Sequence, residues 1–180
     1  MAVPPDFVAG QVLTAAQMNK VGRWLVKTQT IGTAVSSTAV TGAFSADYDQ
    51  YEIIITGGVV SVAGTSSLMT LGSTATGYYW FNYQGNYANT VASSGGVNST
   101  SWFVGLGGTS LGFATRILVG QPFLADESWY ECSYRLATTT GAAGWSGGYL
   151  NNTTSYTDFT ITYSGGTATG GTIYVYGLRD

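Results

Sequence analysis

The feature of this sequence that most constrains its fold is a two-residue alternation of apolar and polar side chains. Residues 28–180 consist of short segments with this alternation, separated by turns of Gly, Ser, Thr and Asn. In the segment 129–136, for example, Tyr130, Cys132 and Tyr134 share one face. Alternation of this kind is typical of half-buried β-strands, because successive side chains in a strand point to opposite faces. We therefore expect an all-β domain with Cys132 as a small core residue.

The alternating pattern recurs about ten times and turns are frequent, which is typical of antiparallel sandwiches and jelly rolls. No repeat of fixed period is visible, which argues against a propeller or a solenoid. The clearest strands are expected at 51–56, 129–136, 159–163 and 172–178, with further candidates near 30–43, 67–72, 78–84, 101–106, 111–119 and 143–150. The predicted fold class is thus an antiparallel β-sandwich or jelly roll.

The first 27 residues have a different pattern. Two early prolines favour an extended arm. Thr14 is a plausible N-cap for a short helix that runs to Lys27. Such a helix either packs on its own domain or docks on another protein. The predicted division is therefore 1–27 for an anchoring arm and helix and 28–180 for the sandwich; the helix would present an apolar face of Met18, Val21 and Leu25.

Charge is scarce along the whole chain. Only 8% of the residues are charged, histidine is absent and cysteine occurs once. A Cys/His zinc site, an intrachain disulfide and a histidine general base are therefore excluded. Three arginines after residue 27 cannot neutralise a row of phosphates, so we expect no nucleic-acid partner. No apolar run approaches the roughly 20 residues of a membrane-spanning helix, so we expect no membrane insertion.

Motifs for catalysis are weak. Gly144–Gly148 matches the G-x-S-x-G pattern of esterases, but Ser146 lacks the histidine that this chemistry requires. The acids near Asp47 and Asp49, like those at 126–131, are typical of turns. Binding of a calcium ion by the first of these two clusters stays an alternative. We expect no catalytic residue, no cofactor and no other metal site, and predict that the chain is not an enzyme.

The most unusual local feature is the segment Tyr78–Tyr87, in which six of ten residues are aromatic. A half-buried strand needs aromatics only at alternate positions, so four in succession place at least two on the outer face. Three alternatives follow: burial against a neighbouring subunit, binding of a glycan or receptor, and burial in the chain's own core. The candidate ligand or subunit interface consists of Tyr79, Phe81, Trp102 and Trp145.

The segment Phe7–Asn19 resembles an N-terminal segment shared by small virion proteins of tailed bacteriophages. Those proteins include minor tail, tail fibre, head-fibre and decoration proteins. The segments Tyr48–Ile55 and Gly170–Leu178 are similar to the first and last strands of their jelly-roll domains. The resemblance covers both ends of the chain and not the aromatic segment.

The resemblance implies a symmetric β-sandwich, typically a trimer, attached to other virion proteins through residues 1–27. We therefore expect a non-enzymatic virion structural protein that is made in the bacterial cytoplasm. It would act as a tail fibre or minor tail component in host recognition and would bind a host-surface glycan or protein. The alternative is a head-fibre, decoration or cement protein of the capsid with a purely structural role. The anchoring side chains would be Phe7, Leu13, Met18, Val21 and Leu25.

Overall fold

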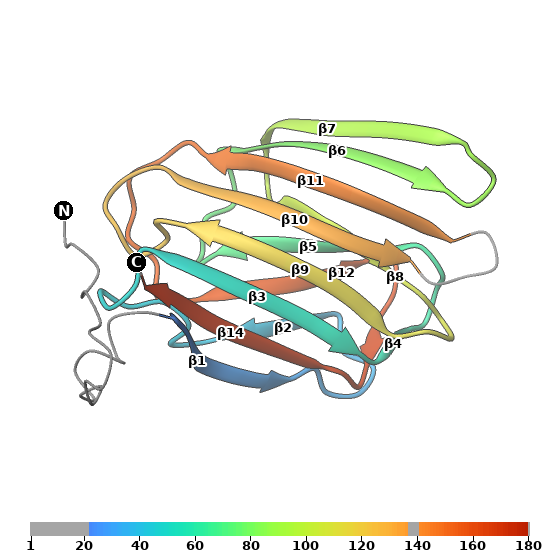
Figure 1. The fold of residues 1–180 in the computed structure, drawn as a ribbon, viewed down its shortest axis with the longest axis horizontal. Helices are drawn as coiled ribbons and strands as arrows, with labels where there is room; N and C mark the ends of the chain where they lie inside the picture. Colours follow the sequence, from blue (N-terminus) through green and yellow to red (C-terminus); the bar gives the residue numbers. More distant parts are fainter. Residues whose placement is uncertain (1–21, 137–140, 180) are drawn as a thin grey trace, which may run out of the picture.

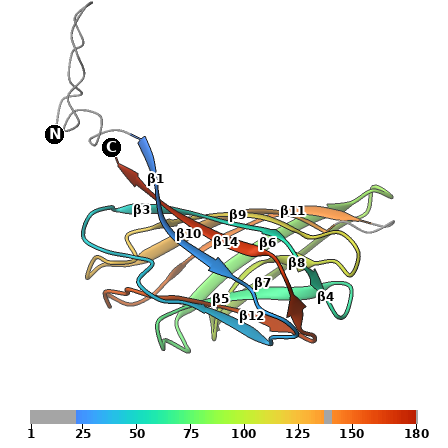
Figure 2. The same cartoon turned by 90° about the horizontal axis from the view of Figure 1, so that it is seen from below.

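The computed structural model describes residues 22–136 and 141–179, and these residues form antiparallel sheets without a helix (Figure 1). The larger sheet has eight strands and the smaller has four, and Figure 2 shows one layer above the other. The predicted all-β, antiparallel architecture is confirmed, while the jelly-roll topology stays a prediction. In spatial order the large sheet consists of β1 (Gly22–Thr30), β14 (Thr172–Arg179), β3 (Gln50–Gly57), β9 (Phe113–Gly120), β10 (Ser128–Leu136), β11 (Ala142–Leu150), β6 (Tyr78–Asn86) and β7 (Val91–Ser99).

The second sheet covers one face of the first. It consists of β2 (Ser37–Val40), β12 (Phe159–Ser164), β5 (Thr65–Leu71) and β8 (Trp102–Gly107). A short pair, β4 (Val59–Val60) with β13 (Ala168–Thr169), forms a third, two-stranded sheet. Every strand pairing in the large sheet is antiparallel. Because successive side chains of a strand point to opposite faces, residues of this sheet point alternately toward the second sheet and toward solvent.

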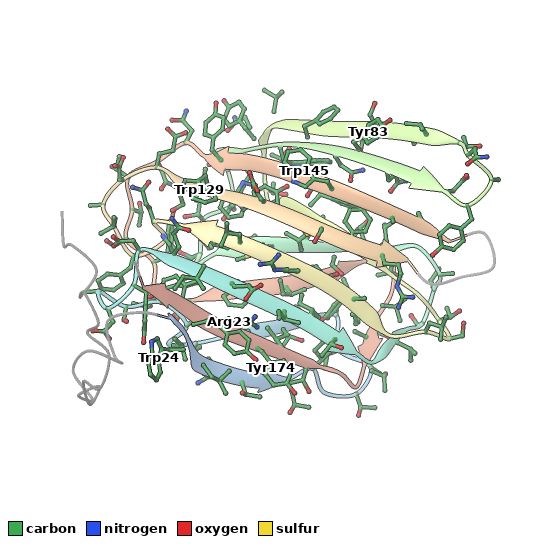
Figure 3. All side chains as sticks on the ribbon, in the orientation of Figure 1. Arg23, Trp24, Tyr83, Trp129, Trp145 and Tyr174 are labelled. Carbon is green, nitrogen blue, oxygen red and sulfur yellow. The ribbon has the colours of Figure 1, made fainter. Side chains whose placement is uncertain are left out.

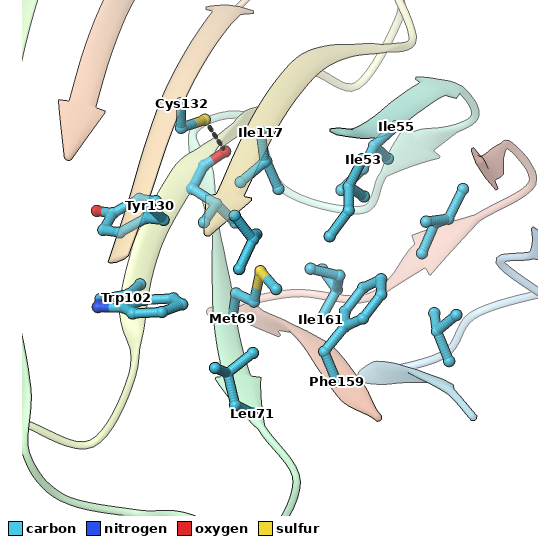
Figure 4. Close-up of a cluster of buried hydrophobic side chains, with 14 of the residues drawn as sticks. Ile53, Ile55, Met69, Leu71, Trp102, Ile117, Tyr130, Cys132, Phe159 and Ile161 are labelled. Carbon is cyan, nitrogen blue, oxygen red and sulfur yellow. Dashed lines mark hydrogen bonds between the residues drawn. The ribbon is translucent and has the colours of Figure 1, made fainter. Parts of the chain in front are cut away.

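The core lies between the two sheets. Ile53, Ile117 and Met69 are fully buried there (Figure 4). Cys132 is also buried, as predicted, and its Sγ lies 3.2 Å from the carbonyl oxygen of Val104. Burial raises the pKa of the Cys132 thiol. Its apolar surroundings therefore keep this cysteine in the protonated, unreactive form.

The alternating segments of the sequence correspond to strands of the structure. The four clearest predictions fall on β3, β10, β12 and β14. The sequence pattern missed β7, whose nine residues include two glycines and three serines. It also missed the two-residue strands β4 and β13.

The predicted N-terminal helix is wrong where the structure describes it. Residues Gly22–Lys27 lie in β1, which pairs with β14 at the edge of the large sheet, so the boundary drawn after Lys27 falls inside a strand. A short helix is marginal in water, whereas this strand gains a ladder of hydrogen bonds from its neighbour. Leu25 lies on β1 and is exposed. The other expected anchoring residues, Phe7, Leu13, Met18 and Val21, lie outside the described residues.

Over the ranges 22–136 and 141–179, no helix is long and apolar enough to cross a membrane.

Candidate binding face on the large sheet

The solvent-facing side of the large sheet carries a cluster of aromatic side chains at the β10, β11 and β6 end. Figure 3 shows Trp129, Trp145 and Tyr83 along this side. Phe81 and Trp145 are 50% and 44% exposed, values that are high for large apolar side chains. We call this surface the aromatic face; its members are Tyr79, Phe81, Tyr83, Trp129, Trp145 and Tyr149.

Strand alternation explains why β6 contributes so much to the aromatic face. Tyr78 points inward and is fully buried, and Trp80 stacks on Phe103 with ring centroids 5.7 Å apart. Tyr79 and Phe81, the residues between and after them, therefore point outward. The run of four aromatics is thus divided between the core and the aromatic face, and the chain does not bury both faces of β6 by itself.

Glycines on the same side of the sheet determine how the two tryptophans lie. A Cβ atom added at Gly120 would lie 2.0 Å from the ring of Trp129, and one added at Gly147 would lie 2.6 Å from the ring of Trp145. Each indole therefore occupies the space above a glycine and lies along the sheet. The arrangement fills gaps in the sheet surface and leaves a flat ring against it.

Tyr79 and Tyr149 are arranged differently. Their rings are nearly parallel, with centroids 4.9 Å apart and an interplanar angle of 3°. Because this separation equals the usual spacing of neighbouring strands, the two rings stand side by side on the sheet. They stack on each other, so their outward contacts are made by ring edges and hydroxyl groups.

Two shallow depressions lie next to the aromatic face. The first has a volume of about 130 Å³ and lies between Arg116 and Leu118 of β9 and Trp145 of β11, with Ser133 between them. The second is larger, about 440 Å³, and extends toward β3. Arg116 and Ser133 line both depressions, so the two adjoin each other.

An ion cluster lies beside the depressions. Glu52 of β3 has a side chain only 3% exposed, and it pairs with Arg23 at 2.8 Å and with Arg116. The guanidinium of Arg23 also lies 3.8 Å from the ring centroid of Tyr176, within cation–π distance. The cluster connects β1, β3 and β9, and it fixes Arg116 at the rim of the first depression.

Replacing Glu52 tests this connection. Glu52→Gln keeps the shape but removes the charge shared by Arg23 and Arg116, and we expect the free energy of unfolding to fall by about 1–2 kcal/mol. Glu131→Gln, on the same side of the sheet and exposed, is the matched control and should change it by less than about 0.5 kcal/mol. Urea denaturation measures both, and equal stability of the two variants would contradict the role of the cluster.

The structure brings together three of the four predicted interface residues. Tyr79, Phe81 and Trp145 lie on the aromatic face. Trp102 does not, and the prediction that it belongs to an exposed interface is wrong. It lies in β8, fully buried between the sheets, where its Nε1 donates a hydrogen bond to the carbonyl oxygen of Tyr149 at 3.1 Å.

Residues that matched catalytic or metal-binding patterns are dispersed or used in packing. Ser146 is fully buried within β11, and its Oγ donates to the carbonyl oxygen of Phe103 at 2.6 Å. It therefore occupies a paired strand, not the exposed strand-to-helix turn that a nucleophile elbow requires. Within the described part of the chain, no three His, Cys, Asp or Glu residues lie close enough together to hold a metal ion.

Sequence reasoning missed Trp129 as a member of the aromatic face, and it missed Arg116 and Glu131 as neighbours of that face. A partial signal existed, because Trp129 and Glu131 lie on the polar side of the alternating segment 129–136. An indole on that side lies outside the core, and Trp129 is half-buried on the aromatic face. Arg116 is the first charged residue after Glu52, so the stretch 53–115 has no charge at all.

No protein-family model matches the chain, and no curated protein matches it either.

Proposed function

We propose that this protein is a non-enzymatic structural component of a tailed-phage virion, of the tail fibre or minor tail type, with a role in host recognition. It would be held in the particle by its N-terminal segment and would display an oligomeric β-sandwich. The observation that carries the proposal is the aromatic face, a set of exposed and half-buried rings on the outer side of the large sheet. Contiguous exposed apolar surface of this kind is typical of interaction sites.

The resemblance of Phe7–Asn19 supports the virion context, and the low charge supports a chain that works within an assembly. The candidate nucleophile Ser146 is committed to hydrogen bonds in the core. Recognition therefore suits the described surface better than hydrolysis. The second candidate function, capsid decoration or cement, would bury the same aromatic face between subunits.

The edge strand β7 supports self-association. Its residues carry no charge and no proline, and Val97 is 81% exposed. Exposed edge strands without charges are templates for pairing with another chain. The opposite edge strand, β1, carries Arg23 and Lys27. We propose that β7 of each copy contacts a different surface of the neighbouring copy, since a trimer, the typical form in the family that it resembles, needs such a head-to-tail contact.

A lysine on β7 tests this contact. Val97→Lys should convert the oligomer to monomers, because edge lysines oppose strand pairing. Val62→Lys, at another exposed valine outside the strands, is the matched control and should leave the oligomer intact. Sedimentation velocity measures both. An unchanged oligomer for Val97→Lys would exclude β7 as the contact.

The anchoring role is tested with a deletion that leaves the sheet complete. Since β1 begins at Gly22, removing residues 1–21 preserves the strand and the Arg23–Glu52 pair. We expect the shortened protein to fold and oligomerise but to be absent from purified particles. If the shortened protein is incorporated like the full chain, another part of the molecule is the anchor.

Location on the particle separates the two candidate functions. Gold-labelled antibodies against the full chain should bind purified virions at the tail if the protein acts in host recognition. Label spread over the capsid would instead support decoration or cement. Absence of the chain from purified virions would overturn both.

A further inference from the structure

We infer that the depression between Arg116 and Trp145 binds a neutral saccharide chain, with the Trp145 indole as its stacking platform. The inference rests on the proposed host-recognition role and names its ligand. Arg116, Ser133 and Trp145 are direct cross-strand neighbours on β9, β10 and β11. A short serine between two long side chains leaves a hollow, which accounts for the 130 Å³ depression.

The aromatic wall suits the face of a sugar ring. Trp145 lies over Gly147, so its ring is spread along the sheet and 44% of the residue stays exposed. The face of an aromatic ring carries partial negative charge. The C–H groups on one face of a pyranose carry partial positive charge and can pack flat against it. A flat, supported indole loses little conformational freedom when it makes this contact.

The polar groups of the same depression suit hydroxyl groups. Arg116 supplies N–H donors, Glu131 supplies carboxylate acceptors and Ser133 supplies a group that does both. Sugar hydroxyls also donate and accept, so neighbouring hydroxyls can use both kinds of partner. Arg116 and Glu131 carry opposite charges in one small site, and this combination favours a neutral ligand over an anion or a cation.

The size of the site favours a chain over a single sugar. At about 130 Å³ the first depression has room for one ring, well below the roughly 300–1,000 Å³ of a typical ligand site. The second, about 440 Å³, shares Arg116 and Ser133 with it and offers space for further units. A ligand that fills both would run across β11, β10 and β9 toward β3.

A second copy of this chain fits the depression less well. The centres of protein–protein interfaces are depleted in charged residues. Here Arg116 is 69% exposed and Glu131 is exposed, and both line the depression itself. Covering them with protein would remove both charges from water, which costs free energy even though Arg116 is paired with Glu52. The uncharged edge strand β7 is a better surface for a second copy.

The test uses the full chain on an array of neutral and acidic oligosaccharides, followed by isothermal titration calorimetry of the best binder, a readout that does not depend on the Trp145 indole. We expect binding to at least one neutral oligosaccharide. Trp145→Ala should weaken it by about tenfold or more, the equivalent of one lost stacking contact of about 1.4 kcal/mol. Trp24→Ala is the matched control, since Trp24 is an exposed indole on the distant strand β1 (Figure 3), and it should bind like the parent.

A second variant gives a result that can be interpreted even if Trp145→Ala does not fold. Ser133→Leu fills the depression at an exposed strand position, and it should abolish binding while the melting temperature stays near that of the parent. No binding anywhere on the array, or equal affinity of the parent, Trp145→Ala and Ser133→Leu, would overturn the inference. Presence at the phage tail without saccharide binding would reject the ligand and keep the proposed function. Saccharide binding by a chain that is absent from virions would keep the ligand and reject the proposed function.

Discussion

Trp102→Ala is expected to lower the free energy of unfolding by about 3–5 kcal/mol, the range for a buried tryptophan truncated in a core. Trp102 is fully buried, its ring lies 4.6 Å from that of Tyr130, and it meets Tyr78 edge-on at 5.3 Å. Its Nε1 also donates a hydrogen bond to the backbone carbonyl oxygen of Tyr149, whose side chain belongs to the aromatic face. In a chain of this length the melting temperature should fall by about 6–20 °C.

Two further variants complete this series: one separates the packing of Trp102 from its hydrogen bond, and the other is a control at an exposed tryptophan. Trp102→Phe keeps an aromatic ring but loses the N–H group, and it should cost about 1–2 kcal/mol less than Trp102→Ala. Trp24→Ala removes an exposed indole and should cost less than about 1 kcal/mol. Calorimetry and urea denaturation measure the series. Similar stabilities for Trp24→Ala and Trp102→Ala would contradict the placement of Trp102 in the core.

Gly148→Ala is expected to cost about 3 kcal/mol, because overpacking against backbone leaves no side chain that can move aside. A Cβ atom at this position of β11 would lie 2.0 Å from the carbonyl oxygen of Tyr79 on β6. The clash would push β6 away from β11, and these strands carry five of the six members of the aromatic face. Amide hydrogen exchange in β6 should therefore rise together with the loss of stability.

Gly85→Ala is the matched control for this prediction. Gly85 lies in β6, and an added Cβ would meet nothing within 4 Å. The substitution should change the free energy of unfolding by less than about 0.5 kcal/mol, since an open strand position accepts a methyl group. Equal stability of the two alanine variants would contradict the close approach of β6 and β11.

Alternation in the sequence predicted those strands that have one face in the core. The segment 129–136 is the clearest case, because Tyr130, Cys132 and Tyr134 face the second sheet, while the charged and polar residues between them face solvent. The pattern failed at β1 and β7, the two edges of the large sheet. Edge strands bury less of either face, so their side chains carry little periodic signal, and their conformation depends on the neighbouring strand.

The candidate site was predicted in part. The run of aromatics on β6 identified Tyr79 and Phe81 as outward-facing, because four successive aromatics cannot share one face of a strand. The sequence pattern could not show that Trp145 points to solvent while Trp102 points into the core. Five of the six residues of β8 are buried, so alternation gives no face there, and only the packing of β8 against the large sheet shows that Trp102 is internal. The depression beside Arg116 depends on strand order, which local sequence does not encode.

Competition for adsorption is the measurement that tests the central claim most directly. Host cells are saturated with the purified full chain, and the adsorption rate of the phage that encodes it is then measured. If the aromatic face recognises the host, the parent protein and Trp24→Ala should slow adsorption strongly, and Trp145→Ala should do so much less. An adsorption rate that the parent protein leaves unchanged would contradict a role in host recognition.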